Sequence, residues 1–236
     1  LLSKELSDVY INKIDTIFRT IYKYGAKRCG IMANPFEGVE KIGKDRSKSL
    51  TFWTYDQYSA FIKLIENPTT HMAFQILYFT GIRIGELFAL TAEDINLAEG
   101  VMHITKSLQR MERQDVITPP KTEKGIRDIT LPAFLTKELE NYMAMIYDCN
   151  SETRLFGMSK QSLYYPMKKY AEQAGIPRIR IHDFRHSHVA LLIEKGVSPL
   201  AIAERLGHDS VTVTLGTYGH LYPNKQREIA DLLELL

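Results

Sequence analysis

The first part of the chain carries apolar residues at the spacing of a helix. Between residues 3 and 28 they recur every three or four positions, which predicts one amphipathic helix. We expect Gly30 and Pro35 to end it. The apolar positions are Leu6, Val9, Tyr10, Ile14, Ile17, Phe18, Ile21 and Tyr22. This short piece offers few partners for such a stripe, and the chain opens at Leu1 without methionine. We therefore expect residues 1–40 to be the C-terminal part of a helical domain from a longer chain.

A basic, polar stretch follows at residues 41–49, with the sequence KIGKDRSKS. Lysine, glycine and serine at this density are typical of a linker between domains. The sequence thus predicts a linker over residues 41–50 and a second domain over residues 51–236. Thr54 and Gln57 form a capping-box pattern ahead of a helix that Asn67-Pro68 is expected to end.

The second domain alternates between helix and strand patterns, with helix dominating. Helices are expected at 71–80, from Arg83 onward, and at 132–146, 162–174, 183–195 and 198–207. Pro166 is expected in the first turn of its helix or at a kink. Strand chemistry appears at 101–105, 116–118 and 126–131, and a turn at 122–125 is expected to join the last two as a hairpin. The fold class predicted is mainly α (α+β), helical with a small antiparallel sheet.

The pattern is ambiguous at two places near the end of the chain. Residues 211–214 read VTVT and alternate as a strand would, although β-branched residues also occur in weakly stable helices. Residues 224–236 carry an apolar helical stripe that either folds onto its own domain or docks elsewhere. The stripe consists of Ile229, Leu232, Leu233 and Leu236.

Composition favours a globular chain without membrane segments. The chain has 236 residues, of which 44% are hydrophobic, enough to bury a full core. It contains neither an apolar run of membrane-spanning length nor a signal-peptide pattern, so we expect a cytoplasmic protein. Cys29 and Cys149 lie far apart and form no metal-binding spacing, which fits free thiols in a reducing compartment.

The net charge gives weak support for a nucleic-acid partner, and the distribution of the charges along the chain gives stronger support. The net charge is only +2, but basic residues dominate between positions 19 and 48. This cluster is either a solvated helix face and linker or a surface that follows phosphates. Arg178 and Arg180 flank an extended segment that leads to His182, and they are further candidates for contacts with DNA phosphates. The candidate DNA contacts are Lys27, Arg28, Lys44, Arg46, Lys48, Arg178 and Arg180.

Residues 182–220 concentrate the side chains that phosphodiester chemistry needs. The segment contains HDFRHSH, then LGH, then TLGTYGH. Cleavage of a phosphodiester without a metal requires a nucleophile, donors to the non-bridging oxygens and an acid for the leaving oxygen. Arg185 and His182 suit the donor role, and His208 adds a third donor. Tyr218 is the candidate nucleophile, and it must lose its proton to a neighbour.

A zinc site is the rival interpretation of the same histidines. His182 and His186 are four residues apart and share a helix face, as in H-x-x-x-H motifs. However, Asp183 stands where the glutamate of that motif would be, and Arg185 puts positive charge beside any metal. Since no third ligand has a motif spacing, we expect neither a metal nor a cofactor. The remaining histidines are then structural or face the substrate: His186, His188 and His220.

HDFRH, LGH and TYGH, in this order and spacing, resemble the second half of the tyrosine recombinase (phage integrase) signature. TGIRIGEL around Arg83 and PPKTEKGIRDI around Lys121 resemble the first half. The resemblance covers roughly residues 50–222. It implies a helical catalytic domain preceded by a DNA-clamping core-binding domain, and it places a short helix at 211–214. Five motifs in order are much more specific than any one alone.

The resemblance implies site-specific recombination of DNA. Tyr218 would attack the scissile phosphate to give a 3′-phosphotyrosine and a free 5′-hydroxyl. Arg83, Arg185 and His208 would stabilise the transition state, and His182 would accept the proton of Tyr218. The remaining roles implied are a turn held by Glu86 and a general acid at Lys121, with Lys124 as its fallback.

The implied partner is double-stranded DNA, bound in a tetrameric synapse whose protomers exchange C-terminal residues. Accessory DNA-bending or directionality proteins are further possible partners. Two alternatives stay open: a type IB topoisomerase-like enzyme that acts on one duplex, and a non-catalytic DNA-binding relative. The sequence names neither the DNA site nor the choice between integration, excision and resolution.

Overall fold

The computed structural model describes residues 6–43, 50–112, 114–120, 122–222 and 233–234. The chain divides into two compact units, Leu1–Ser49 and Leu50–Leu236. The division falls at the basic stretch where the sequence predicts a linker. Each unit is described separately below.

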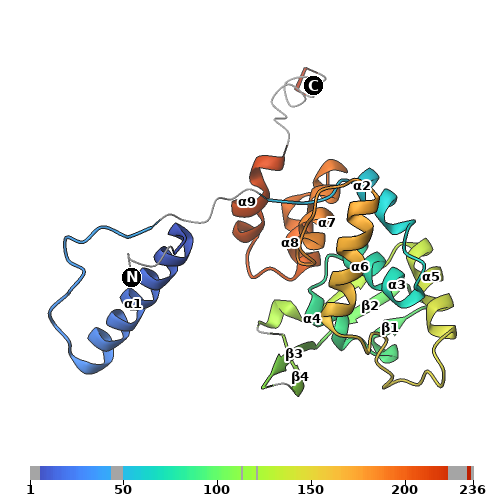
Figure 1. Cartoon of the computed structure of the whole chain (residues 1–236), viewed down its shortest axis with the longest axis horizontal. Coiled ribbons are helices and arrows are strands. Elements are labelled where there is room, and N and C mark those ends of the chain that lie inside the picture. The colour runs from blue at the N-terminus through green and yellow to red at the C-terminus, as the bar shows by residue number, and fades with distance from the viewer. Residues whose placement is uncertain (1–5, 44–49, 113, 121, 223–232, 235–236) are drawn as a thin grey trace. The chain divides into compact units, whose positions relative to one another are not determined.

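The first unit is built on one long helix, α1 (Asp8–Cys29), as the apolar periodicity predicts (Figure 1). Ser7 caps its first turn, and Gly30, in the left-handed conformation with φ 66°, ends it. Arg19 binds the Asp15 carboxylate at 2.8 Å and also donates to two backbone carbonyls of the returning segment. Much of the apolar stripe stays exposed on this unit, at Val9, Tyr10, Ile17, Phe18 and Ile21.

The second unit is mainly helical, which confirms the predicted fold class (Figure 1). Asn67 and Pro68 begin a helix rather than end one. The Asn67 side chain accepts a hydrogen bond from the Thr70 amide, so α2 ends earlier and α3 begins earlier than predicted. The helices are α2 (Tyr55–Ile62), α3 (Pro68–Thr80), α4 (Ile84–Ala89), α5 (Ala133–Ala144), α6 (Lys160–Gln173), α7 (Asp183–Glu194), α8 (Pro199–Leu206) and α9 (Val211–Tyr218).

Five short strands form two antiparallel sheets in the described part of this unit. The first sheet has the order β1-β2-β5, and the second pairs β3 with β4. Short 3₁₀ turns lie between these elements at η1 (Ala92–Asp94) and η2 (Glu123–Gly125), and η3 (Gly219–Leu221) follows α9. The strands are β1 (Ile95–Asn96), β2 (Val101–Ile104), β3 (Ser107–Met111), β4 (Gln114–Thr118) and β5 (Arg127–Thr130).

The predicted hairpin between residues 116–118 and 126–131 is wrong. β4 pairs with β3, where Leu108 lies opposite Ile117, whereas β5 pairs with β2, where Met102 lies opposite Ile129. Met102 and Ile129 are both buried, so the core selects this pairing. β3 was missed because its mostly exposed residues show no apolar alternation. Residues 119–126 therefore connect two sheets, with η2 among them, and Lys121 lies outside the described residues.

The aromatic core fixes the helix that carries the HDFRHSH motif. Phe184 of α7 is fully buried and packs against Trp53, Phe61 and Phe74, with ring centroids between 5.1 and 6.1 Å away. Aromatic contacts of this kind hold a helix in position and rotation. Since Phe184 directly precedes Arg185, the core also sets the direction in which Arg185 points.

Residues 211–214 are helical, so the strand interpretation of this segment is wrong and the family pattern is right. Pro166 lies inside α6, beyond its first turn. The C-terminal stripe at 224–236 falls mainly outside the described residues.

Candidate active site

Arg83 lies at the junction of α3 and α4. Gly81 ends α3 with φ 67°, and a Cβ there would lie 2.6 Å from the His188 ring, so the turn needs glycine. The Glu86 carboxylate then accepts two hydrogen bonds from Arg83, one from the backbone N–H at 2.9 Å and one from the guanidinium at 2.8 Å. The carboxylate thus holds the turn, as the pattern implies. The Arg83 side chain keeps 43% of its surface exposed, which leaves donors available for a ligand.

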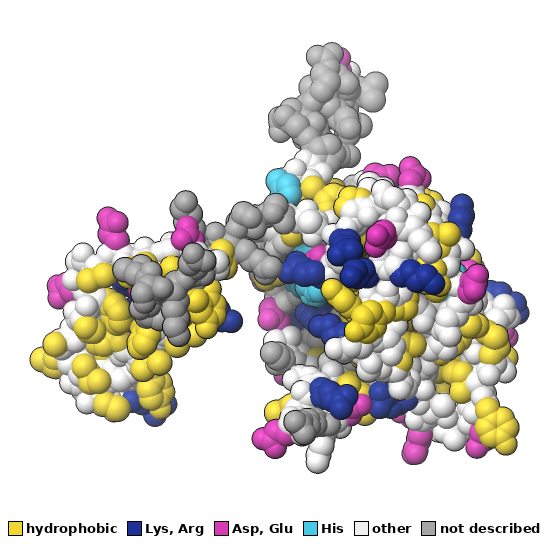
Figure 2. All heavy atoms as spheres, viewed as in Figure 1, with side chains coloured by type: hydrophobic (Ala, Val, Ile, Leu, Met, Phe, Trp, Pro, Cys, Tyr) yellow, Lys and Arg dark blue, Asp and Glu magenta, His cyan; other side chains and the backbone are white. Residues whose placement is uncertain are grey.

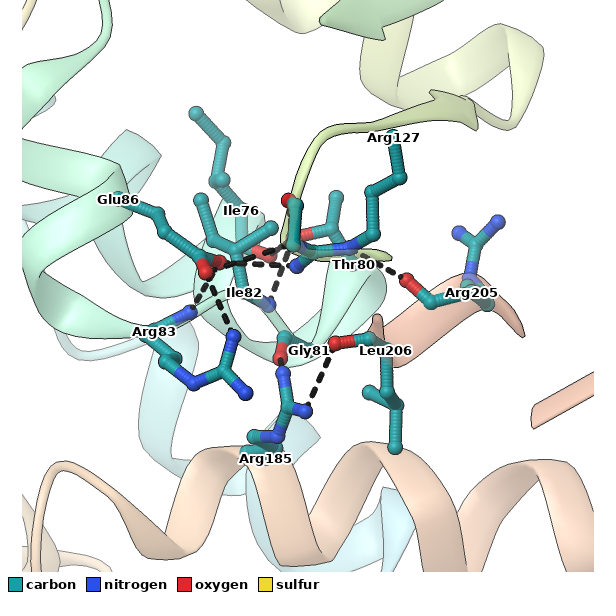
Figure 3. A network of polar contacts seen from close by, with 11 residues as sticks. Ile76, Thr80, Gly81, Ile82, Arg83, Glu86, Arg127, Arg185, Arg205 and Leu206 are labelled. Carbon is teal, nitrogen blue, oxygen red and sulfur yellow. Dashed lines mark hydrogen bonds and ion pairs between the residues drawn. The ribbon is translucent and has the colours of Figure 1, made fainter. Parts of the chain in front are cut away.

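Arg127 is a second partner of Glu86 that the sequence analysis missed. Its guanidinium binds the carboxylate at 2.8 Å, with side-chain exposures of only 6% and 3% (Figure 3). Its Nε also donates to the carbonyl of Arg205 at 2.9 Å. Arg127 therefore joins β5 to α4 and to the end of α8. These contacts keep the pKa of Glu86 below its usual value, although burial alone would raise it.

Arg185 reaches out of α7 into the same network. Its guanidinium donates to the carbonyl oxygens of Gly81 at 2.9 Å and Leu206 at 2.8 Å (Figure 3). Both carbonyls belong to helix C-termini, whose partial negative charge suits a cation. Burial, together with repulsion from Arg83, lowers the pKa of Arg185 to about 9. The side chain therefore remains charged at neutral pH, and within the described part of the chain its hydrogen bonds go to carbonyl oxygens rather than to a carboxylate.

Positive charge exceeds negative charge in this network, as far as the structure describes it. Glu86 is the carboxylate that Arg83 and Arg127 share. A further guanidinium, that of Arg205, donates to neutral acceptors, including His188 Nε2 at 3.2 Å. Guanidinium groups with one shared counter-ion form a site for an anion, and their planar forks match phosphate oxygens.

Tyr218, at the end of α9, is buried with 3% of its surface exposed. It packs into a small apolar cluster of α7 and α8 residues that includes Val189 and Ile202. Its hydroxyl lies 2.6 Å from Nδ1 of His186. Burial raises the pKa of Tyr218 to about 12, and Arg185 acts in the opposite direction. The hydroxyl is therefore protonated at neutral pH.

His208 and His182 lie near the arginines as well. His208 Nδ1 contacts the buried Thr214 hydroxyl at 2.8 Å, which leaves Nε2 for a ligand. Burial, then Arg185 and Arg83, lower the pKa of His208 to about 4. The pKa of His182 is also lowered, first by burial and then by Arg185. The structure therefore brings together the predicted site residues that it describes: Arg83, His182, Arg185, His208 and Tyr218.

The lysines of the connecting segment are only partly described. Lys121 lies outside the described residues, so its role stays a prediction. Lys124 donates to the carbonyl of Asp209 at 2.8 Å, directly after His208. This contact brings the fallback lysine close to the candidate site.

Asp183 organises the entry to α7. It is fully buried and binds the fork of Arg180 at 2.7 Å and the hydroxyl of Thr51 at 3.1 Å. One helical turn along, the Ser187 hydroxyl accepts the amide of Trp53 at 2.9 Å. Arg180 therefore has a structural partner in addition to any DNA contact.

The other candidate DNA contacts differ in what the structure describes of them. Lys27 and Arg28 are exposed in the last turn of α1. Arg178 is exposed and lies 3.6 Å from Glu172. Lys44, Arg46 and Lys48 lie outside the described residues. Figure 2 shows several Lys and Arg side chains on one face of the second unit. Lys168 and Lys169 of α6 are exposed as well.

Among the described residues, no group of three or more His, Cys, Asp or Glu side chains is arranged to hold a metal ion. The His182 and His186 rings lie 5.4 Å apart, centroid to centroid. The described helices include none that is both long and apolar enough to cross a membrane.

Comparison with known proteins identifies the family of the chain. The model of the Phage integrase family matches residues 51–225. The ICEBs1 integrase of Bacillus subtilis is 35% identical over 99% of the chain and 67% of its own length. A putative prophage phiRv2 integrase of Mycobacterium tuberculosis is 30% identical over 78% of the chain and 50% of its own length. The chain thus spans about half to two thirds of these relatives.

The fold has also been observed in a solved structure. The Tn1549 transposon integrase, in complex with a circular intermediate DNA, aligns with a TM-score of 0.78 and 21% identity. The alignment covers 99% of this chain and 81% of that one.

Proposed function

The chain belongs to the phage integrase family, whose members cleave and rejoin DNA, and we propose that it is the catalytic part of a site-specific DNA recombinase. One observation carries the proposal: the Tyr218 hydroxyl lies within electrostatic reach of the Arg185 guanidinium, which in turn lies close enough to Arg83 for the two charges to repel. Such a site can bind a phosphodiester and supply the nucleophile that attacks it.

In the proposed reaction, the Tyr218 oxygen attacks the scissile phosphorus. The product is a 3′-phosphotyrosine with a free 5′-hydroxyl. Arg83 and Arg185 donate to the non-bridging oxygens, and His208 and His182 add neutral donors. Lys121 protonates the leaving 5′-oxygen, since an alkoxide is a poor leaving group. A 5′-hydroxyl from a second duplex then reverses the step, and the covalent bond stores the energy that rejoining needs.

We assign double-stranded DNA as the substrate. The Tn1549 transposon integrase was solved with DNA, and the exposed Lys168, Lys169 and Arg178 of the second unit offer this chain contacts for phosphates. Residues 1–40 would then be part of a DNA-clamping core-binding domain, residues 41–50 its linker and residues 51–236 the catalytic domain. Exchange between two duplexes requires a tetrameric synapse, and accessory proteins would set its direction.

The test is to trap the covalent intermediate on a nicked suicide substrate, from which the 5′-terminal fragment diffuses away. We expect a DNA adduct at Tyr218, identified by mass spectrometry. Tyr218→Phe should abolish the adduct while DNA binding is retained, and Tyr222→Phe should leave it intact. An adduct at Tyr222, or none with the wild-type protein on a library of DNA sites, would contradict the proposal. Relaxation of supercoils without strand exchange would indicate topoisomerase-like activity instead.

A further inference from the structure

The Tyr218 hydroxyl already has a hydrogen-bond partner, and it is His186. The distance from Tyr218 Oη to His186 Nδ1 is 2.6 Å, and the two ring centroids lie 5.5 Å apart. A hydroxyl and an imidazole nitrogen at this distance form a short, strong hydrogen bond. The sequence analysis left His186 as a structural or substrate-facing residue. The geometry instead places it on the atom that attacks the phosphate.

A carboxylate lies on the other side of the same imidazole. Asp183 Oδ1 is 3.8 Å from His186 Nε2, and the Asp183 side chain is 1% exposed. The distance is too long for a hydrogen bond but short enough for charge attraction. A negative charge facing Nε2 favours the tautomer that carries its proton there. Nδ1 then has a free lone pair, so the Tyr218 hydroxyl donates and His186 accepts.

We propose that His186 is the proton acceptor for Tyr218 and that Asp183 positions it and stabilises its charged form. The inference rests on the proposed function. As the bond from Tyr218 Oη to phosphorus forms, the hydroxyl proton moves to His186 Nδ1. The bond from phosphorus to the 5′-oxygen breaks, and that oxygen takes its proton from the general acid. In the rejoining step His186 returns its proton to Tyr218. A nucleophile, a base and a carboxylate in series follow the logic of hydrolase triads.

The charges around His186 suit this role. Burial first, and then His182, lower the pKa of His186 to about 4, and Arg180 and Arg185 act in the same direction. Asp183 acts in the opposite direction. From α9, the facing titratable group is Tyr218. The imidazole is therefore neutral at physiological pH. A bound phosphate would offset the arginine charges and make His186 a stronger base when substrate is present.

His182 has a different position. It is exposed at the start of α7, where Arg185 and Arg83 influence its pKa. This position suits a donor to the phosphate. The two histidines thus divide two roles that the sequence analysis gave to His182 alone.

The first experiment compares His186→Asn with His182→Asn in single-turnover cleavage of the suicide substrate. The asparagine oxygen can accept the Tyr218 hydrogen bond near the position of Nδ1, but it cannot take a proton. We expect His186→Asn to bind DNA and to cleave roughly 10²- to 10⁴-fold more slowly, the usual loss for a general base. The wild-type rate should fall at low pH as His186 becomes protonated, and this decline should be weaker in His186→Asn.

The controls separate base catalysis from hydrogen bonding. His182→Asn should keep the low-pH decline, and His103→Asn, at a half-buried β2 position whose ring contacts Asp128, should cleave as the wild type does. A His186→Asn variant with wild-type rates would overturn the inference, as would loss of the low-pH decline in His182→Asn alone. If the wild-type protein forms no adduct, the proposed function itself fails. If the wild type forms the adduct and His186→Asn cleaves at the same rate, this inference is wrong and the proposed function stands.

A second measurement needs no variant and covers the case in which His186→Asn does not fold. Nitrogen-15 NMR of the wild-type protein reports which nitrogen of each imidazole carries the proton. We expect the Nε2–H tautomer at His186. An Nδ1–H tautomer would mean that His186 donates to Tyr218, which would exclude it as the acceptor.

Discussion

The Glu86 carboxylate binds the Arg127 guanidinium at 2.8 Å with both side chains almost fully buried. Removing one partner of a buried ion pair leaves the other charge uncompensated and typically costs about 3–5 kcal/mol. We therefore expect Glu86→Gln to lower the free energy of unfolding by several kcal/mol, measured by urea denaturation. Glu140→Gln is the matched control, since Glu140 pairs with Lys137 on the exposed surface. It should change stability by less than about 1 kcal/mol.

The same pair predicts a dependence of stability on pH. Glu86 has a lowered pKa in the folded protein, because contacts with Arg127 and Arg83 outweigh the raising effect of burial. Its stabilising contribution is complete above the pKa of the unfolded state and is lost as pH falls through the folded pKa. Denaturation between pH 6 and pH 3 should show a steeper loss for the wild type than for Glu86→Gln. Parallel curves would refute the assignment.

Arg83 and Arg185 should respond differently to the same substitution. Arg185 bridges two carbonyls while buried, and a lysine ammonium cannot reproduce that fork. Arg185→Lys should therefore lose both stability and cleavage. The Arg83 side chain is 43% exposed, so Arg83→Lys should keep most of the stability and lose cleavage by roughly 10²- to 10³-fold. Thermal unfolding and single-turnover cleavage measure the two effects. Equal losses of stability would contradict the distinction.

Thr214 orients His208 through the 2.8 Å contact with Nδ1. Thr214→Val keeps the shape and removes the hydroxyl, which should cost about 1 kcal/mol because a part-buried nitrogen loses its hydrogen bond. Cleavage should slow further because Nε2 is no longer held toward the phosphate. Thr212→Val, at an exposed position of the same helix, is the control for changed helix propensity. If both variants cleave at the wild-type rate, Thr214 has no positioning role.

The general acid can be tested without structural knowledge of Lys121. Replacing the bridging 5′-oxygen of the DNA by sulfur creates a leaving group that departs without a proton. Lys121→Ala should be slower by roughly 10²- to 10⁴-fold on normal DNA and near the wild type on the sulfur substrate. Arg185→Ala should stay slow on both, since the non-bridging oxygens still need donors. Rescue of Lys124→Ala instead would move the acid to the lysine beside Asp209.

The parts of the fold that depend on local signals were predictable. Ser198 and Gly207 bound α8 as expected, because a cap and a left-handed terminus are determined within one turn. The pairing of β4 was not predictable in this way, since strand partners are chosen by contacts distant in sequence. β3 and β4 also lack a buried face that would specify register.

The candidate site shows the same difference between local signals and contacts distant in sequence. The motifs named Arg83, Arg185, His208 and Tyr218, and the structure brings them together. His186 lies 32 positions from Tyr218, so sequence spacing cannot indicate which imidazole nitrogen meets that hydroxyl. Arg127 was missed because one arginine in a strand has no sequence signal for a buried carboxylate partner.

The contacts of Thr51 with Asp183 and of Trp53 with Ser187 couple the opening of residues 51–53 to that of α7. The first residues of the second unit are hydrogen-bonded to the helix that carries Arg185 and His186. Fluctuations that release residues 51–53 must break these bonds, so this segment and the first turns of α7 share one local unfolding equilibrium. Their amide hydrogens should exchange with solvent at a common free energy. Residues 51–53 and the reacting groups carried by α7 thus belong to one cooperative element.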